Sequence, residues 1–141
     1  MIYEEIKKDI FTMDKNKWYF GHCIASDFGM GAGIAVQFQK KFNLRNKLSN
    51  STEDSSPGSC ILINNVFNLI TKKRSSGKPT YKTLESSLLN MRNLIVNDNI
   101  QFVAMPQIGC GLDRLSWPVV RKYITNVFDD VDVFITICKW R

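Results

Sequence analysis

The chain has 141 residues, 44% of them hydrophobic and 23% charged, and carries a formal net charge of +6 at pH 7. A chain of this length and composition buries most of the apolar surface that its unfolded form exposes, so one globular domain over residues 1–141 is predicted. No run of about 18 apolar residues occurs and the N-terminal segment lacks the apolar core of a signal peptide, so a cytoplasmic protein without a membrane partner is expected.

The first third of the chain predicts two short strands and an amphipathic helix. Residues 1–6 and 18–25 are rich in aromatic and Ile side chains, as strands are. The glycine-rich segment 27–33 follows, and apolar residues then recur at helical spacing: Ile34, Ala35, Phe38 and Phe42. Residues 43–48 predict a further helical turn, and the polar segment 49–59 predicts a loop.

The middle third predicts a strand pair and a long helix. Two β-rich runs, 60–65 and 66–73, meet at a predicted turn at Asn64 and Asn65, which indicates adjacent strands. A loop leads to Thr80, which can cap a helix that ends near residues 97–99. The apolar face of this helix repeats at Leu84, Leu88, Met91 and Ile95.

The last third predicts a strand at 101–106, a glycine-containing loop, a helix and a final strand at 131–140. Ser116 is expected to cap the helix, with Pro118 in the first turn, where its missing N–H costs little. The inward face comprises Val120, Ile124, Val127 and Phe128. Strands that alternate with helices predict an α/β fold with three layers and a mixed central sheet.

Two glycine loops, 27–33 and 107–113, have the same context, because each follows a strand and precedes a helix. Ligands of open α/β sheets bind at such places, and glycine lets a phosphate approach the backbone closely. Neither loop matches a P-loop or a Rossmann fingerprint. Taken singly, either loop is equally well explained as a turn, but the pair favours two loops that bind a diphosphate from opposite sides.

Other features argue against metals and nucleic acids. Four cysteines lie far apart without a C-x-x-C pair, and the single histidine, His22, cannot complete a zinc site, so neither a metal nor a cofactor is expected. The basic pairs are separated and an acidic segment, 129–132, interrupts them. A solvated surface is therefore favoured over a nucleic-acid partner, while a small phosphate-bearing ligand is compatible with the charge. His22 in its apolar strand is interpreted as a hydrogen-bonded core residue.

Four segments together resemble the macro domain, and specifically its branch of terminal ADP-ribose protein glycohydrolases. They are KKDIF (7–11), HCIASDFGMGAGIAVQFQKKF (22–42), ITKKRSSGKPTY (70–81) and MPQIGCGLDRLSW (105–117). The resemblance runs from about residue 2 to the end of the chain, with a shorter middle loop. It implies a macro domain of three-layer α/β/α type, a monomer without cofactor or metal, and ADP-ribose and ADP-ribosylated proteins as partners.

The resemblance also implies ligand-binding residues. Asp9 matches the acidic residue that receives the adenine amine, and Ile10 lies beside the base. The loop over the proximal phosphate and distal ribose is matched by Gly31, Ala32, Gly33 and Ile34. The second diphosphate loop is matched by Gln107, Ile108, Gly109, Cys110, Gly111 and Leu112, and Trp140 is expected to border the adenine pocket. Gly29 and Gln107 stand where relatives often have arginine, so two polar contacts of those relatives are absent.

The catalytic pair that the resemblance implies is Lys72 and Asp113. An amine becomes a competent nucleophile toward a sugar when burial or a neighbouring cation lowers its pKa, and Lys73 and Arg74 are neighbouring cations. A nearby carboxylate can move the proton. In relatives the lysine attacks the distal ribose of glutamyl-linked ADP-ribose and the aspartate resolves the adduct. From the residues alone, Lys72 to Arg74 would be a solvated loop.

Three functions remain open at this stage. The leading hypothesis is a hydrolase of ADP-ribosyl esters on glutamate or aspartate, with O-acyl-ADP-ribose as a further substrate. The second is a phosphatase of ADP-ribose 1″-phosphate, and the third is a non-catalytic reader or sponge of ADP-ribose. The pair of Lys72 and Asp113 favours an enzyme, since a reader does not require it.

Overall fold

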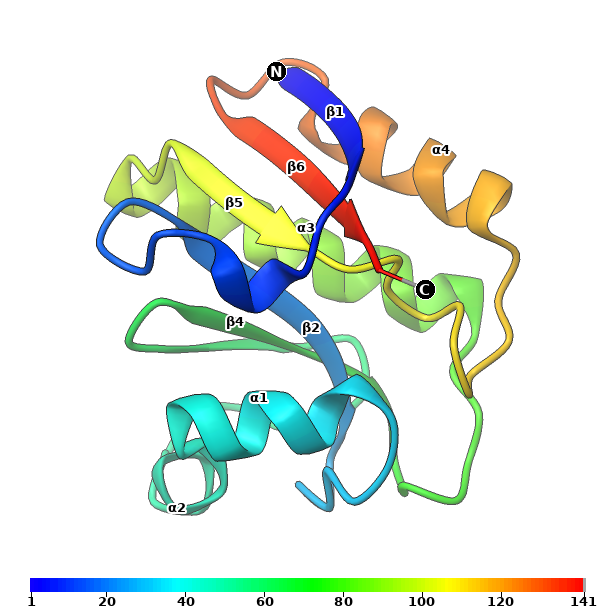
Figure 1. Ribbon diagram of the computed structural model, residues 1–141. Helices are drawn as coiled ribbons and strands as arrows, with labels where there is room; N and C mark the ends of the chain where they lie inside the picture. Colours follow the sequence, from blue (N-terminus) through cyan, green and yellow to red (C-terminus); the bar gives the residue numbers. More distant parts are fainter. Residues whose placement is uncertain (141) are drawn as a thin grey trace.

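The computed structural model describes residues 1–140, which form a sheet between two layers of helices (Figure 1). The strand order of this sheet is β1-β6-β5-β2-β4-β3. All neighbouring strands are parallel except β3, which runs antiparallel to β4. The bounds are β1 (Ile2–Lys7), β2 (Tyr19–Ala25), β3 (Cys60–Ile63), β4 (Val66–Lys72), β5 (Phe102–Met105) and β6 (Phe134–Lys139). The predicted mixed sheet is confirmed.

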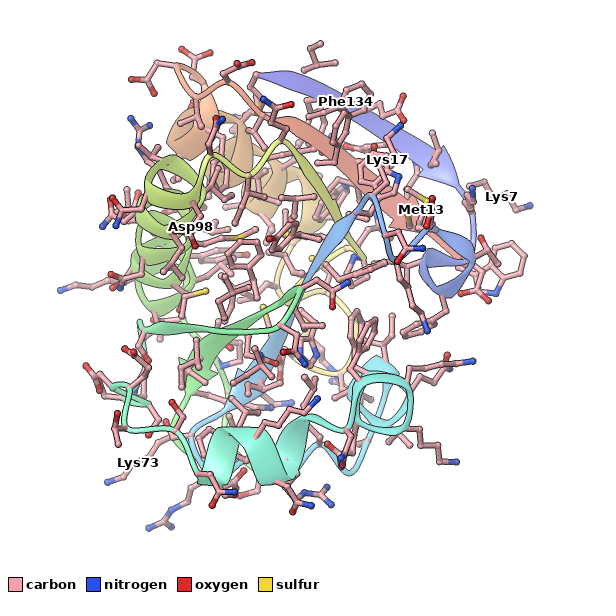
Figure 2. All side chains as sticks on the ribbon, turned by 90° about the vertical axis from the view of Figure 1, so that its left-hand side faces the viewer. Lys7, Met13, Lys17, Lys73, Asp98 and Phe134 are labelled. Carbon is pink, nitrogen blue, oxygen red and sulfur yellow. The ribbon has the colours of Figure 1, made fainter. Side chains whose placement is uncertain are left out.

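Helices cover both faces of the sheet. One face carries α3 (Tyr81–Asp98) and α4 (Trp117–Phe128), and the other carries the short 3-10 helix η1 (Ile10–Thr12), α1 (Ile34–Phe42) and α2 (Leu44–Ser49). The predicted inward residues of α3 and α4 are buried, each stabilising the fold by about 1.5–3 kcal/mol. Figure 2 shows side chains filling the space between α3 and the sheet. Within residues 1–140 no helix has the length and apolarity to cross a bilayer.

The two long helices begin in different ways. Thr80 caps α3 as predicted, since its side chain accepts from the Thr83 N–H while the Thr83 hydroxyl accepts from the Thr80 N–H. Ser116 is the N-cap residue of α4 and Pro118 lies in the first turn, as predicted, but the Ser116 side chain makes no capping hydrogen bond, so that part of the prediction is wrong. Its N–H instead donates to the Tyr81 hydroxyl at 2.9 Å, a contact with another helix that no local pattern reveals.

Glu5 fastens α4 to the edge of the sheet. Its carboxylate accepts from the Arg121 guanidinium at 2.5 and 3.0 Å, from the Trp117 indole at 3.3 Å and from the Tyr3 hydroxyl at 2.7 Å. The hydrogen bond from Arg121 holds the pKa of Glu5 down to about 2. Because Trp117 opens α4, this network fixes the helix that follows the second glycine loop.

His22 lies in the core, as predicted. The side-chain N–H groups of Asn68 donate to the backbone carbonyls of Ile61 and Val66, so its oxygen faces the ring and accepts from His22 Nε2 at 2.6 Å. The ring stacks on Phe38 with centroids 4.2 Å apart. Burial lowers the pKa of His22 to about 4, so the ring is neutral in the folded protein at pH 7.

This buried ring makes stability depend on pH. The unfolded chain takes up a proton near pH 6.5, whereas the folded ring takes one up only near pH 4, so stability is expected to fall by about 3 kcal/mol as the pH is lowered between these values. Urea unfolding at a series of pH values measures this loss. His22→Phe should be less stable but should lack this slope, and the same slope in the variant would contradict the assignment.

Candidate active site

A cleft of about 1090 Å³ opens at the carboxyl ends of the central parallel strands. Such an edge is where open α/β sheets bind ligands. Figure 1 shows the end of β6 close to the loop that follows β5. Residues 106–113 of that loop line the cleft. The lining includes every residue singled out in the sequence for binding or catalysis: Asp9, Ile10, Gly31, Ala32, Gly33, Ile34, Lys72, Gln107, Ile108, Gly109, Cys110, Gly111, Leu112, Asp113 and Trp140.

Lys72 and Asp113 meet in this cleft. Lys72 is the last residue of β4 and Asp113 lies in the loop after β5, yet Lys72 Nζ donates to Asp113 Oδ1 at 2.7 Å. The two side chains are only 14% and 16% exposed. An amine and a carboxylate are thus within proton-transfer distance at the surface of the cleft.

The first glycine loop has an unusual backbone. Phe28 and Met30 have positive φ angles, an uncommon conformation for residues with side chains and one that concentrates at functional sites. Gly33 has φ 63° and ψ −152°, a region that glycine alone adopts readily. Gly33 also offers no side-chain acceptor to the first turn of α1, which therefore presents N–H groups suited to an anion.

The glycines of these loops stand in two different environments. Gly109 has φ 72°, and a Cβ there would lie 2.9 Å from Leu115 Cδ1, so the protein itself requires glycine at this position. A Cβ on Gly31 or Gly111 would instead meet no protein atom within 4 Å. The backbone at these two positions therefore faces open space, where a ligand can approach it closely.

Glutamate at Gly31 or Gly111 is expected to weaken ADP-ribose binding by at least about tenfold, because it brings bulk and a negative charge to a diphosphate site. The open space at both positions means that the fold should persist. Calorimetry measures the affinity and thermal unfolding checks the fold, with Thr52→Glu in an exposed loop as the control for added charge. Wild-type affinity in both cleft variants would mean that the loops only turn the chain.

Asp9 stands where β1 gives way to η1. Its Oδ1 accepts from the Phe11 N–H at 3.1 Å, which caps η1 and leaves Oδ2 without a hydrogen bond from the described residues. Buried Ile10 and exposed Trp140 line the same end of the cleft. This end combines a carboxylate oxygen with apolar surface, as an adenine ring requires.

Replacing Asp9 with alanine is expected to weaken the binding of every adenine-containing ligand by about 1–3 kcal/mol, the usual scale for a lost charge-assisted hydrogen bond. Asp9→Asn is the sharper variant, because its oxygen can still cap η1 while its NH₂ group cannot accept from the adenine amine. Titration with AMP and ADP-ribose measures both effects. If only Asp9→Ala loses affinity, Asp9 acts through the cap and not through the base.

Hydrogen bonds join segment 73–79 to both glycine loops, and they were not predicted from the sequence. Asp27 accepts from the backbone N–H of Ser75 at 2.8 Å, from the Ser75 hydroxyl at 2.7 Å and from the Gly29 N–H at 2.9 Å. The Ser75 bonds hold the pKa of Asp27 below its usual range. Lys78 lies in the same segment as Ser75, and its Nζ donates to the carbonyl of Leu112 in the second glycine loop at 3.0 Å. Segment 73–79 therefore ties both glycine loops together, which strand and helix periodicity cannot reveal.

Cys110 lines the cleft between two loop glycines. Its thiol is half-buried and donates to the Ile108 carbonyl at 3.3 Å, and burial raises its pKa to about 11. A protonated thiol is a poor nucleophile at neutral pH. The contact fits its interpretation as a small packing residue.

Comparison with solved structures defines the class of protein. The macrodomain of Mycobacterium tuberculosis DarG superimposes with a TM-score of 0.87 at 21% identity, covering 97% of each chain. Thermosipho africanus DarTG, solved in complex with ADP-ribose, superimposes with a TM-score of 0.74 at 17% identity, covering 89% of this chain and 38% of that one. The fold is that of a macro domain.

Sequence comparison places the chain within that class. No family model matches it. Human ADP-ribose glycohydrolase OARD1 is 41% identical over 134 residues, which span 94% of this chain and 88% of the human protein. The chain therefore belongs to the macro domain family, as the motifs predicted, among the relatives of ADP-ribose glycohydrolase OARD1.

Proposed function

We propose that this protein is an ADP-ribose glycohydrolase that releases ADP-ribose from glutamyl and aspartyl esters on proteins. The observation that carries the proposal is the contact of Lys72 Nζ with Asp113 Oδ1 at 2.7 Å in a cleft between two glycine loops. The relationship to human ADP-ribose glycohydrolase OARD1 supports the hydrolase activity. Esters of small acids with ADP-ribose present the same bond and are proposed as further substrates.

In the proposed mechanism Asp113 takes a proton from the Lys72 ammonium, and the free amine attacks C1″ of the distal ribose. The bond between C1″ and the ester oxygen breaks, and the carboxylate of the target protein leaves. Asp113 passes its proton to solvent and then takes a proton from the water that attacks C1″ of the adduct. The bond between C1″ and Lys72 Nζ breaks, and ADP-ribose and the lysine amine are released. All of these steps use the two side chains that already touch.

Binding is assigned to the rest of the cleft. The first turn of α1 and the loop over Gly109 and Gly111 hold the diphosphate from two sides, since each brings glycine backbone to the cleft. Asp9 and Ile10 hold adenine at the other end. ADP-ribose is therefore expected to bind much more tightly than AMP.

One assay tests the function. The protein is incubated with glutamyl-linked and serine-linked ADP-ribose peptides and with ADP-ribose 1″-phosphate, and the products are identified by mass spectrometry. Release of ADP-ribose from the glutamyl peptide is expected. Release of phosphate alone would replace the proposal with a phosphatase, and ADP-ribose binding without any turnover would replace it with a reader.

A further inference from the structure

The loops that line the cleft around Lys72 carry more cations than acids, and one of these cations, Lys78, lines the cleft itself. The three loops at the mouth of the cleft, residues 26–33, 73–79 and 107–116, contain the exposed cations Lys73, Arg74, Lys78 and Arg114. Their only acidic residues are Asp27 and Asp113. Because Lys72 and Asp113 touch, the residues that follow each of them flank the same point from two different loops.

The acids at this mouth are already occupied. Asp27 accepts three hydrogen bonds from Ser75 and Gly29, and Asp113 accepts a hydrogen bond from the Lys72 ammonium group. Within residues 1–140 no ion pair involves Lys73, Arg74 or Arg114. Lys73 lies at the periphery of the molecule in Figure 2, outside the packed interior. The rim thus carries positive charge that the described part of the chain does not neutralise.

We infer that this rim, defined as Lys73, Arg74 and Arg114, docks acidic polypeptide segments, so that the enzyme prefers ADP-ribosylated glutamates with Asp and Glu neighbours. This inference rests on the proposed function, in which the modified side chain must reach Lys72. The polypeptide on either side of that side chain then passes over the loops that carry these three cations, which can bind its carboxylates. Opposite charges at such a mouth speed encounter and fix orientation.

A nucleic-acid strand fits this surface less well than a peptide. Single-stranded nucleic acids bind where aromatic rings accompany the cations, because bases stack on them. Segments 73–79 and 107–116 contain no aromatic residue, and the one aromatic residue of segment 26–33, Phe28, is partly buried against the core. The rim itself offers only charge, and the loop that carries Arg114 adds an aliphatic side chain, Leu112, which is 62% exposed. Carboxylates along a flexible peptide need no stacking surface.

The test compares two glutamyl-ADP-ribose peptides that differ only in their neighbours, one with Asp and Glu and one with Ser and Gly. At low salt the acidic peptide is expected to have a kcat/KM about tenfold higher, on the scale of a few exposed ion pairs. In about 0.5 M salt the preference should shrink, because screening acts over a few ångströms. Equal values for the two peptides at low salt would overturn the docking inference.

Neutral variants locate the effect. Arg74→Gln with Arg114→Gln should remove most of the preference, measured as the ratio of kcat/KM for the two peptides. An effect of Arg74 on the Lys72 amine changes both values alike, and hydrolysis of acetyl-ADP-ribose, which has no polypeptide, measures that common effect. Lys40→Gln with Lys47→Gln removes the same charge from exposed positions on α1 and α2 and should keep the preference. A preference retained in the Arg74 and Arg114 variant would overturn the inference.

Two further outcomes separate the possible failures. Hydrolysis of neither peptide nor acetyl-ADP-ribose by the wild-type protein would refute the proposed function itself. Normal hydrolysis of acetyl-ADP-ribose with equal use of both peptides would refute only the docking surface. If a single-stranded oligonucleotide binds the wild-type protein but not the Arg74 and Arg114 variant, the rim is a nucleic-acid surface and the peptide assignment is wrong.

Discussion

Replacing Lys72 with alanine is expected to lower the turnover of glutamyl-ADP-ribose by about a thousandfold or more, because the attacking amine is lost. The affinity for ADP-ribose should change little, since the glycine loops and Asp9 remain. Single-turnover kinetics measures the first quantity and calorimetry the second. A loss of kcat with retained affinity is the signature of a group that acts in the transition state.

Two variants separate the chemistry from the ion pair. Lys72→Arg keeps a cation beside Asp113, but a guanidinium does not give up its proton and cannot act as the nucleophile, so this variant should be as inactive as Lys72→Ala. Lys73→Ala removes the exposed neighbour and should retain most of the activity. Wild-type turnover in Lys72→Ala, or full activity in Lys72→Arg, would rule out covalent catalysis by this amine.

The Asp113→Ala variant should behave differently from Lys72→Ala. Without the carboxylate, the Lys72 ammonium can still lose its proton to solvent, whereas hydrolysis of the adduct needs a base for the attacking water. Release is therefore expected to slow more than attack, so that an adduct accumulates while turnover falls by about 10²–10⁴-fold. Mass spectrometry of the protein after incubation with substrate should find added ADP-ribose mass on the peptide that contains Lys72.

Asp113→Asn is the matched control for this experiment. The amide keeps the size of the side chain and can still accept from Lys72 Nζ, but it cannot take up a proton at neutral pH. Both variants should therefore trap the same adduct, and the double variant Lys72→Arg with Asp113→Ala should trap none. An adduct that maps to another residue would disprove the assigned nucleophile.

The sequence by itself determined the elements of this fold and their class. The repeat of Leu84, Leu88, Met91 and Ile95 and the cap at Thr80 specify α3 within one segment, because burial of one helix face and the pairing of its first N–H groups are local requirements. The two glycine loops and the motifs around them could also be identified in the sequence. They predicted the macro domain that the fold and the relatives confirm.

Only the tertiary structure decided which side chains meet. Lys72 and Asp113 are 41 residues apart and come together because β4, β2 and β5 are parallel neighbours, so that their carboxyl ends lie at one edge of the sheet. From the residues alone the lysine belonged to a solvated loop. The Asp27 bonds to Ser75 and the bond from the Ser116 N–H to Tyr81 also depend on how separate segments pack. Strand order and loop packing depend on burial summed over the whole chain, and no local period records them.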